Sequence, residues 1–386
     1  MLDFDDYHRH VLPERLATPA GRMAVDDIRD APSLAWRLPD GRAWRHVADG
    51  GALRIVPGDD AAVVAELDES AWRDFVAEVA TAAGLHYGGR IRFAAGGYAD
   101  LERWEPALRA LYAGRPIFDP RRVDLRDRDG APLDLARAFA LDAGEPLRHF
   151  LHTAGFALVK GVFAPDEIAR LAEIVERRQA QAAPGDGHSW WATRADGGSA
   201  LCRLIYLGLV EPAIAALGDD PRIGRLMALA DEPLRAVRDR SDGTSVVIKN
   251  GNIAEGLSDL PWHRDCGLGG HPFICPKINI GIQLDAASER SGRLHFAPGT
   301  WRASCHRGDL AQAVTVAVDT EPGDCTIHFG DVMHAAPPPI DDGPGRRALY
   351  LSCVPERAFA HIPPGKSYND TILARVGRQE SLVAGR

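Results

Sequence analysis

The chain has 386 residues, 45% of them hydrophobic and 26% charged, and a formal net charge of -9. These values are typical of a soluble globular protein with room for one or two hydrophobic cores. The acidic balance argues against a nucleic-acid or anionic-membrane partner, since both favour basic surfaces. No stretch approaches the roughly 20 apolar residues of a membrane span. The acidic first ten residues do not resemble a signal peptide, so we expect a cytoplasmic location.

The first 118 residues contain the pattern of a small α+β domain, which we place at 15–118. Three strand-like runs are separated by turn residues, at 34–38, 44–47 and 52–56. A helix with Ser70 as its N-cap is then predicted from apolar residues at i, i+3, i+4 and i+7. A strand at 90–93 and a helix with an apolar stripe over 101–111 follow. Residues 119–134, rich in Arg, Asp, Pro and Gly, are predicted to be a linker.

This first domain resembles sterol-carrier-type lipid-binding domains. The resemblance is carried by a strand pair with a tryptophan in each strand, by its two turns and by two helices: Trp36, Asp40-Gly41, Trp44, Asp49-Gly50, the helix at Trp72 and the helix over 101–112. It implies a domain that holds a lipid. An unrelated α+β domain remains the alternative.

Residues 135–386 are predicted to form a second domain. A helix over 146–153 and a strand over 156–162 precede a helix that opens with a proline and acidic residues near 164–167. Beyond residue 244 the sequence changes to short strands separated by Gly and Pro. We predict them at 245–249, 277–284, 294–297, 314–318, 325–329 and 348–354. Several short strands with turns between them favour a barrel or a jelly-roll pair of sheets.

A candidate metal site begins at His263-Arg264-Asp265. In an extended segment side chains alternate, so His263 and Asp265 lie on the same side. A second histidine would complete a set of two imidazoles and one carboxylate, which suits iron(II) and leaves three positions open for a cosubstrate and O2. His334, about 70 residues later, is the candidate, and His328 competes with it.

Further polar residues are predicted to bind an organic cosubstrate. Arg346 lies at the entry to the predicted strand 348–354, and its planar fork can bind the far carboxylate of a keto acid such as 2-oxoglutarate. Arg347 is its alternative. Strand alternation puts Ser352 on the face of Arg346, where its hydroxyl could add to the same contact. Asn279 and Gln283 lie on the polar face of the 277–284 strand, which faces either the cosubstrate and substrate or solvent.

Taken together, these motifs resemble the phytanoyl-CoA dioxygenase family of iron(II)- and 2-oxoglutarate-dependent oxygenases over about residues 140–356. The matching segments are Gly155, Gly161-Val162-Phe163, His263-Arg264-Asp265, Leu284-Asp285, Phe296-Ala297-Pro298-Gly299-Thr300, Pro322-Gly323-Asp324, His334 and Arg346-Arg347-Ala348-Leu349. Trp301 departs from the family, in which a histidine usually follows the Pro-Gly segment. The resemblance favours His334 over His328 and Arg346 over Arg347.

The resemblance implies a double-stranded β-helix, or jelly-roll, core flanked by helices. It further implies a dioxygenase that uses iron(II), 2-oxoglutarate and O2 to hydroxylate a C–H bond of a small hydrophobic molecule, with release of succinate and CO2. Because Asp265 is present, halogenation is not expected: halogenases of this chemistry have a small residue in place of the carboxylate. One alternative is a lipid carrier with a vestigial metal site. Another is a cupin-type hydrolase or isomerase, which usually needs more histidines and a glutamate.

Overall fold

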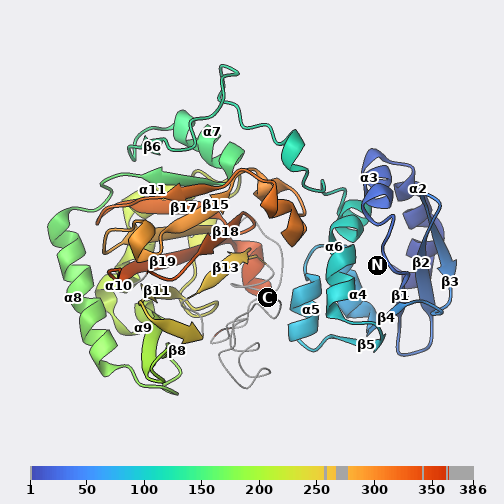
Figure 1. The fold of residues 1–386 in the computed structure, drawn as a ribbon, viewed down its shortest axis with the longest axis horizontal. Coiled ribbons are helices and arrows are strands. Elements are labelled where there is room, and N and C mark those ends of the chain that lie inside the picture. The colour runs from blue at the N-terminus through green and yellow to red at the C-terminus, as the bar shows by residue number, and fades with distance from the viewer. Residues whose placement is uncertain (1, 256–258, 267–276, 341–342, 362–363, 365–386) are drawn as a thin grey trace. The chain divides into compact units, whose positions relative to one another are not determined.

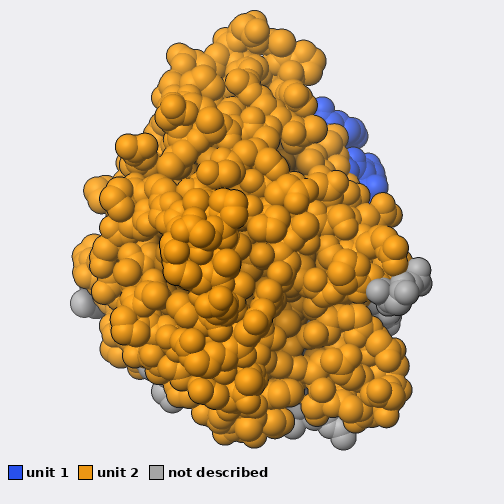
Figure 2. All heavy atoms as spheres, turned by 90° about the vertical axis from the view of Figure 1, so that its left-hand side faces the viewer, with its two compact units in different colours: residues 1–123, 271–274, 302–313 blue, residues 124–270, 275–301, 314–386 orange. Residues whose placement is uncertain are grey.

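The computed structural model describes residues 2–255, 259–266, 277–340, 343–361 and 364. It divides the chain into two compact units, distinguished by colour in Figure 2. Unit 1 contains residues 1–123 and the later segment 302–313, and unit 2 contains the other described residues. Each unit has a hydrophobic core of its own. Unit 1 therefore differs from the predicted domain 15–118 by its first residues and by a segment contributed from much later in the chain.

Unit 1 is a mixed sheet with helices (Figure 1). The strand order is β3-β2-β1-β4-β5, with β1 and β4 parallel and the other neighbours antiparallel. The strands are β1 Leu34–Arg37, β2 Ala43–Asp49, β3 Ala52–Pro57, β4 Val63–Leu67 and β5 Ile91–Ala95. The helices are α1 Phe4–Asp6, η1 Tyr7–Val11, α2 Leu12–Leu16, α3 Pro19–Asp27, α4 Glu69–Val76, α5 Ala82–Tyr87 and α6 Tyr98–Ala113.

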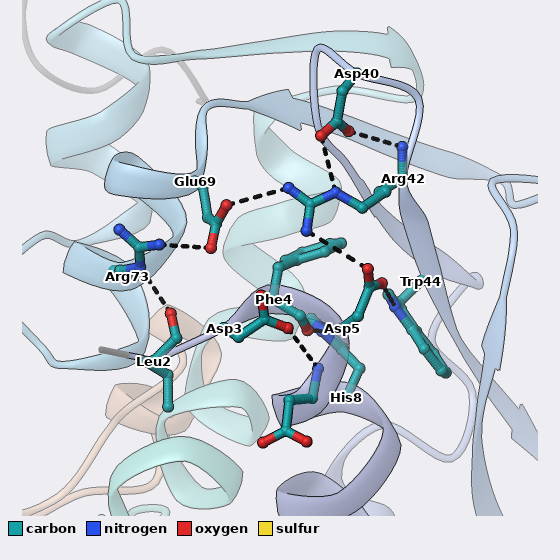
Figure 3. Close-up of polar contacts among 11 residues, drawn as sticks. Leu2, Asp3, Phe4, Asp5, His8, Asp40, Arg42, Trp44, Glu69 and Arg73 are labelled. Carbon is teal, nitrogen blue, oxygen red and sulfur yellow. Dashed lines mark hydrogen bonds and ion pairs between the residues drawn. The ribbon is translucent and has the colours of Figure 1, made fainter.

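The start of the chain belongs to the core of unit 1. Two side chains near the start of β2 hold Asp5 in place: the Arg42 guanidinium at 3.4 Å and the Trp44 indole, which donates to it at 2.7 Å (Figure 3). The same guanidinium also contacts Asp40 at 2.8 Å and Glu69 at 3.1 Å. These polar contacts surround apolar side chains from the first helices that are fully or almost fully buried: Phe4, Tyr7 and Leu12. The segment before residue 15 is therefore structural, which the sequence pattern did not indicate.

Helix α4 begins earlier than the sequence predicted. Asp68, rather than Ser70, has the extended backbone of an N-cap, and its carboxylate accepts from the Ala71 N–H at 2.7 Å. Both residue types are good caps, and Ser70 lies inside the first turn. The resemblance of this unit to sterol-carrier-type domains stays a prediction.

Unit 2 contains two β-sheets. The large sheet has the order β12-β8-β9-β11-β19-β14-β17-β7-β6, with β10 paired to β19, and the small one has the order β13-β18-β15-β16. The large sheet consists of β6 Ala138–Phe139, β7 Phe156–Val159, β8 Ser189–Arg194, β9 Ser199–Leu204, β10 Leu234–Ala236, β11 Thr244–Lys249, β12 Ile253–Glu255, β14 Ile278–Gln283, β17 Cys325–Phe329 and β19 Arg346–Pro355. The small sheet consists of β13 Leu260–His263, β15 Leu294–Ala297, β16 Val316–Val318 and β18 Met333–Ala336.

The two sheets of unit 2 pack face to face. Phe156 on β7 of the large sheet stacks on Phe296 on β15 of the small sheet, with ring centroids 4.5 Å apart. The helices of this unit are α7 Glu145–Ala154, α8 Pro165–Gln181, α9 Leu207–Val210, α10 Pro212–Ala215 and α11 Pro221–Met227. The mixed α+β class predicted from the sequence is confirmed.

Trp301, the departure from the family pattern, has a packing role. Its ring stacks on Phe329 at 4.0 Å, and its indole N–H donates to the His152 carbonyl at 3.0 Å. A side chain at Gly155 would come within 2.8 Å of this ring. The tryptophan thus fills a space that glycine leaves, on the outer side of β17.

Two absences bear on the expectations from composition. No helix among the described residues is long and apolar enough to cross a membrane. No disulfide joins the cysteines in the described part of the chain.

Candidate metal centre

His263, Asp265 and His334 meet between the two sheets of unit 2. His263 ends β13 and lies directly opposite His334 on the neighbouring strand β18. The Nε2 atoms of His263 and His334 lie 3.7 Å and 3.8 Å from the two carboxylate oxygens of Asp265. One ligand atom from each residue fits within 4.8 Å of the others, a spacing that suits a bound metal ion. The structure thus brings together the three residues predicted from the sequence.

The two imidazoles present a lone pair to the centre. Nδ1 of His263 is 2.6 Å from the Pro261 carbonyl, and Nδ1 of His334 is 3.1 Å from the Val332 carbonyl. A carbonyl only accepts, so each Nδ1 carries the proton and each Nε2 is left free to bind a metal. Burial lowers the pKa of both histidines to about 4, which keeps them neutral at neutral pH. The donor set therefore fits a divalent iron.

Asp265 is held as a carboxylate. Burial alone would raise its pKa, but the neighbouring His334 imidazole, the Lys277 ammonium and the hydrogen bond from His328 outweigh burial and hold this pKa well below the ordinary value. Asn279 Nδ2 donates to Oδ2 of Asp265, and His328 Nε2 lies 3.1 Å from the same atom. Oδ2 is thus anchored by the large sheet.

His328 therefore acts on the centre through Asp265. It lies on β17, while the metal-binding set comes from the segment around β13 and from β18. Ser352 on β19 extends the same chain of contacts, because its hydroxyl donates to Asn279 Oδ1 at 3.0 Å. Asn279 and Ser352 were predicted to bind the cosubstrate, and this stays a prediction. In the structure both side chains lie in the chain of contacts that ends on the Asp265 carboxylate.

Arg346 is a buried cation prepared for an anionic ligand. It is 2% exposed, its Nε donates to the Gly292 carbonyl, and neither Nη atom has an acidic partner among the described residues. Tyr350, on the same face of β19, interacts with it through a side-chain hydrogen bond. A buried guanidinium without an anionic partner is costly. Because its planar fork matches a carboxylate, the distal carboxylate of 2-oxoglutarate is a fitting partner.

The position of Arg346 is consistent with a cosubstrate that also reaches the metal. Arg346 pairs in register with Lys249 on β11. The Lys249 ammonium donates to the carbonyl of Ala336, two residues after His334 on β18. Arg346 therefore lies near the C-terminal end of β18, two residues along the strand from His334.

The remaining residues that were predicted to bind the cosubstrate lie at different distances from Arg346 or on another face of the sheet. Arg347 points to the opposite face of β19, where it pairs with Asp285 and Glu176 at 2.8 Å and 2.9 Å. Ser352 is six residues from Arg346, roughly 20 Å along a strand, so the structure does not bring the two to one carboxylate. Gln283 lies opposite Ala348, nearer to Arg346, and its amide contacts Thr326 at 3.3 Å.

Two features of the site were not predicted. Arg264, the middle residue of the HxD motif, forms an ion pair with Asp331 at 3.2 Å, and the Asp265 N–H donates to the Gly330 carbonyl at 2.8 Å. These contacts join the HxD segment to the β17–β18 turn. Strand alternation could have indicated that Arg264 points away from the metal, but not its partner. The second feature is Lys277, whose stem runs beside Gly330.

The donor set of two histidines and one carboxylate is the one that non-haem iron enzymes use. The chain belongs to the phytanoyl-CoA dioxygenase family, whose model matches residues 151–348, slightly more than half of its length. Iron(II) and 2-oxoglutarate are the cofactors of this family and of this chain, as the sequence predicted. No curated protein matches it.

Solved structures resemble this chain only remotely. AviO1 from Streptomyces viridochromogenes Tue57 is 23% identical, with 56% of this chain and 96% of that one covered and a TM-score of 0.46. The non-haem α-ketoglutarate-dependent epimerase SnoN from nogalamycin biosynthesis is 20% identical, with 54% and 81% covered and a TM-score of 0.45. EctD from S. alaskensis, solved with 2-oxoglutarate and 5-hydroxyectoine, is 17% identical, with 62% and 82% covered and a TM-score of 0.45. None of them bears on the substrate of this chain.

Proposed function

We propose that this chain is a dioxygenase that hydroxylates a C–H bond of a small, largely hydrophobic molecule. The observation that carries the proposal is that two features occur together in the interior of unit 2. Three ligand atoms of His263, Asp265 and His334 converge, and Arg346 in the same interior has a buried fork without an anionic partner among the described residues. A metal site alone would not require that arginine, whereas a keto-acid cosubstrate does.

Each residue has a role that follows from its position. His263, Asp265 and His334 would hold one face of the ion and leave the other open to ligands. Arg346 would bind the distal carboxylate of 2-oxoglutarate and so orient its keto-acid end toward the open face. Bound iron(II) would supply the activation of O2 for C–H oxidation, coupled to conversion of 2-oxoglutarate to succinate and CO2. Asp265 occupies the position that a halide would need, which supports hydroxylation over halogenation.

We also propose that the two sheets of unit 2 form a double-stranded β-helix. The order of the strands supports it: from β13 to β19 the chain passes between the small and the large sheet at every step except β15 to β16. Such alternation is how a jelly roll is wound. It also explains why ligands from β13 and β18 face the supporting residues of β14 and β17.

The proposal is tested by the visible charge-transfer band of the anaerobic complex with iron(II) and 2-oxoglutarate. His263→Ala and Asp265→Ala should abolish the band, because each removes one of three protein ligands. His295→Ala, in the same small sheet but outside the triad, is the matched control and should keep it. An unchanged band in both triad variants would refute the metal assignment.

The alternative function, a lipid carrier with a vestigial metal site, makes a different prediction. A carrier would load iron without turning over 2-oxoglutarate. Succinate formation by the iron-loaded protein, measured with and without candidate substrates, separates the two. Stimulation of that turnover by one compound would also identify the substrate.

A further inference from the structure

Lys277 is a buried lysine on the face of the large sheet that carries the metal-supporting residues. It directly precedes β14, and strand alternation puts it on the same face as Asn279, whose amide contacts Asp265. Its residue is 2% exposed. A Cβ on Gly330 would lie 3.2 Å from Cβ and from Cδ of Lys277, so its stem runs along the backbone that links β17 to β18.

Lys277 is joined to the HxD segment through Gly330. The Gly330 N–H donates to the Lys277 carbonyl at 2.7 Å, and the Gly330 carbonyl accepts from the Asp265 N–H at 2.8 Å. The Lys277 side chain lies on the same face as Asn279, whose amide donates to the Asp265 carboxylate. It therefore leaves its strand beside Asp265, on the side of the sheet that faces the metal centre.

Among the described residues, no side chain or carbonyl forms a hydrogen bond or ion pair with this ammonium. The other cations around the site differ in this respect. Arg264 pairs with Asp331, Arg203 pairs with Asp242, and Lys249 donates to a backbone carbonyl. A buried charge without a partner is costly unless a ligand supplies the partner.

The proposed cofactors do not supply that partner. The two negative charges of 2-oxoglutarate and the one of Asp265 balance the two of iron(II) and the one of Arg346. Lys277 and Lys249 are left over in this balance, and of the two Lys249 donates a hydrogen bond to a carbonyl. An anionic group beside the metal would compensate the charge of Lys277.

We propose that Lys277 is a substrate-binding residue and that the substrate carries a carboxylate, which the Lys277 ammonium binds next to the metal. The proposal rests on the proposed function and narrows it: the small hydrophobic substrate is an organic acid. An ammonium holds such a group as a point charge. It would fix the acid end of the molecule and so decide which carbon faces the metal.

The test uses the full-length protein with zinc in place of iron and with saturating 2-oxoglutarate, so that binding is measured without turnover. Straight-chain acids from butanoate to decanoate and the matching primary amides are titrated calorimetrically. Wild-type protein should prefer at least one acid over its amide. Lys277→Met should lose about tenfold to a hundredfold in affinity for that acid and leave amide binding unchanged. Lys277→Arg should keep most of the affinity.

Lys160→Met is the matched control, because it removes a lysine of unit 2 that is paired with Asp324. It should bind the acids like wild type. Circular dichroism and zinc content are measured for every variant. Loss of zinc in Lys277→Met would show a structural charge and overturn the proposal, and so would equal binding of every acid and its amide.

The two possible sources of the carboxylate are separated by titrating 2-oxoglutarate itself. If Lys277→Met weakens 2-oxoglutarate more than tenfold and leaves acid binding unchanged, the anion is the cosubstrate's, and the inferred substrate class is wrong. If wild-type protein fails to bind 2-oxoglutarate at all, the proposed function fails, independently of Lys277.

Discussion

At the scale of single residues, the two adjacent arginines should behave differently. Arg346→Ala removes the partner of a buried carboxylate, which costs on the order of 2–5 kcal/mol, roughly 30-fold to a few thousandfold in affinity. The apparent KM for 2-oxoglutarate should rise accordingly while iron binding, followed by equilibrium titration, changes little. Arg346→Lys should rescue only part of the loss, because an ammonium lacks the planar fork.

Arg347→Ala provides the comparison for that prediction. Its guanidinium is mostly buried between Asp285 and Glu176 rather than on an open surface. Its removal should lower the thermal stability, by about 1–3 kcal/mol, and leave the KM for 2-oxoglutarate near its wild-type value. A large KM defect at Arg347 with little at Arg346 would mean that the roles are reversed.

At the scale of elements, the β17–β18 turn should set the geometry of the metal centre. The Arg264–Asp331 ion pair joins this turn to the HxD segment, and both side chains are nearly buried. Arg264→Met and Asp331→Asn should each weaken iron(II) binding, measured by anaerobic titration, because the HxD segment is then held to β18 by fewer contacts. The double variant should lose less than the sum of the two, as partners in one contact do. Additive losses would show that the pair does not act as a unit.

At the scale of the whole molecule, unit 1 should make stability depend on pH. His8 is buried against Trp44 and Trp72, and burial lowers its pKa to about 4, against smaller opposing effects of the Phe4 carbonyl and Asp5. As pH falls below the unfolded value of about 6.5, the unfolded chain binds the proton first. The contribution of neutral His8 to the free energy of unfolding is thus fully present above pH 6.5 and is lost as the pH falls towards 4. At pH 5 the loss from this one group is about 2 kcal/mol relative to neutral pH.

His8→Gln isolates that contribution, because glutamine does not titrate. Chemical unfolding at pH 7.5 and at pH 5 should show a smaller stability loss in the variant than in wild type. The histidines of the metal centre are unchanged in both proteins, so their contribution cancels in the comparison. Equal losses in the two proteins would exclude His8 as the source.

The sequence by itself determined the chemistry of the site. Spacing in the HxD motif sufficed for His263 and Asp265, since alternation along one short segment puts them on one side. The same alternation separated Arg346 from Arg347, whose burial in the structure differs as expected. Strands β15 and β17 were predicted with their observed bounds, because each is bordered by turn residues. Strands β8, β9, β13 and β18 were not predicted, because apolar and polar residues do not clearly alternate in their sequences.

Only the tertiary structure decided which residues far apart in the chain share a contact. Strand pairing across two facing sheets brings His328 and Asn279 to Asp265 and takes Ser352 away from Arg346, a consequence of register that no local pattern encodes. The same pairing places Lys277 on the face of Asn279, where its charge has no hydrogen-bond or ion-pair partner among the described residues. The first residues of unit 1 likewise show their role only through a core built with strands further along the chain. Local periodicity fixes which face of an element a side chain takes, whereas packing between elements fixes what that face meets.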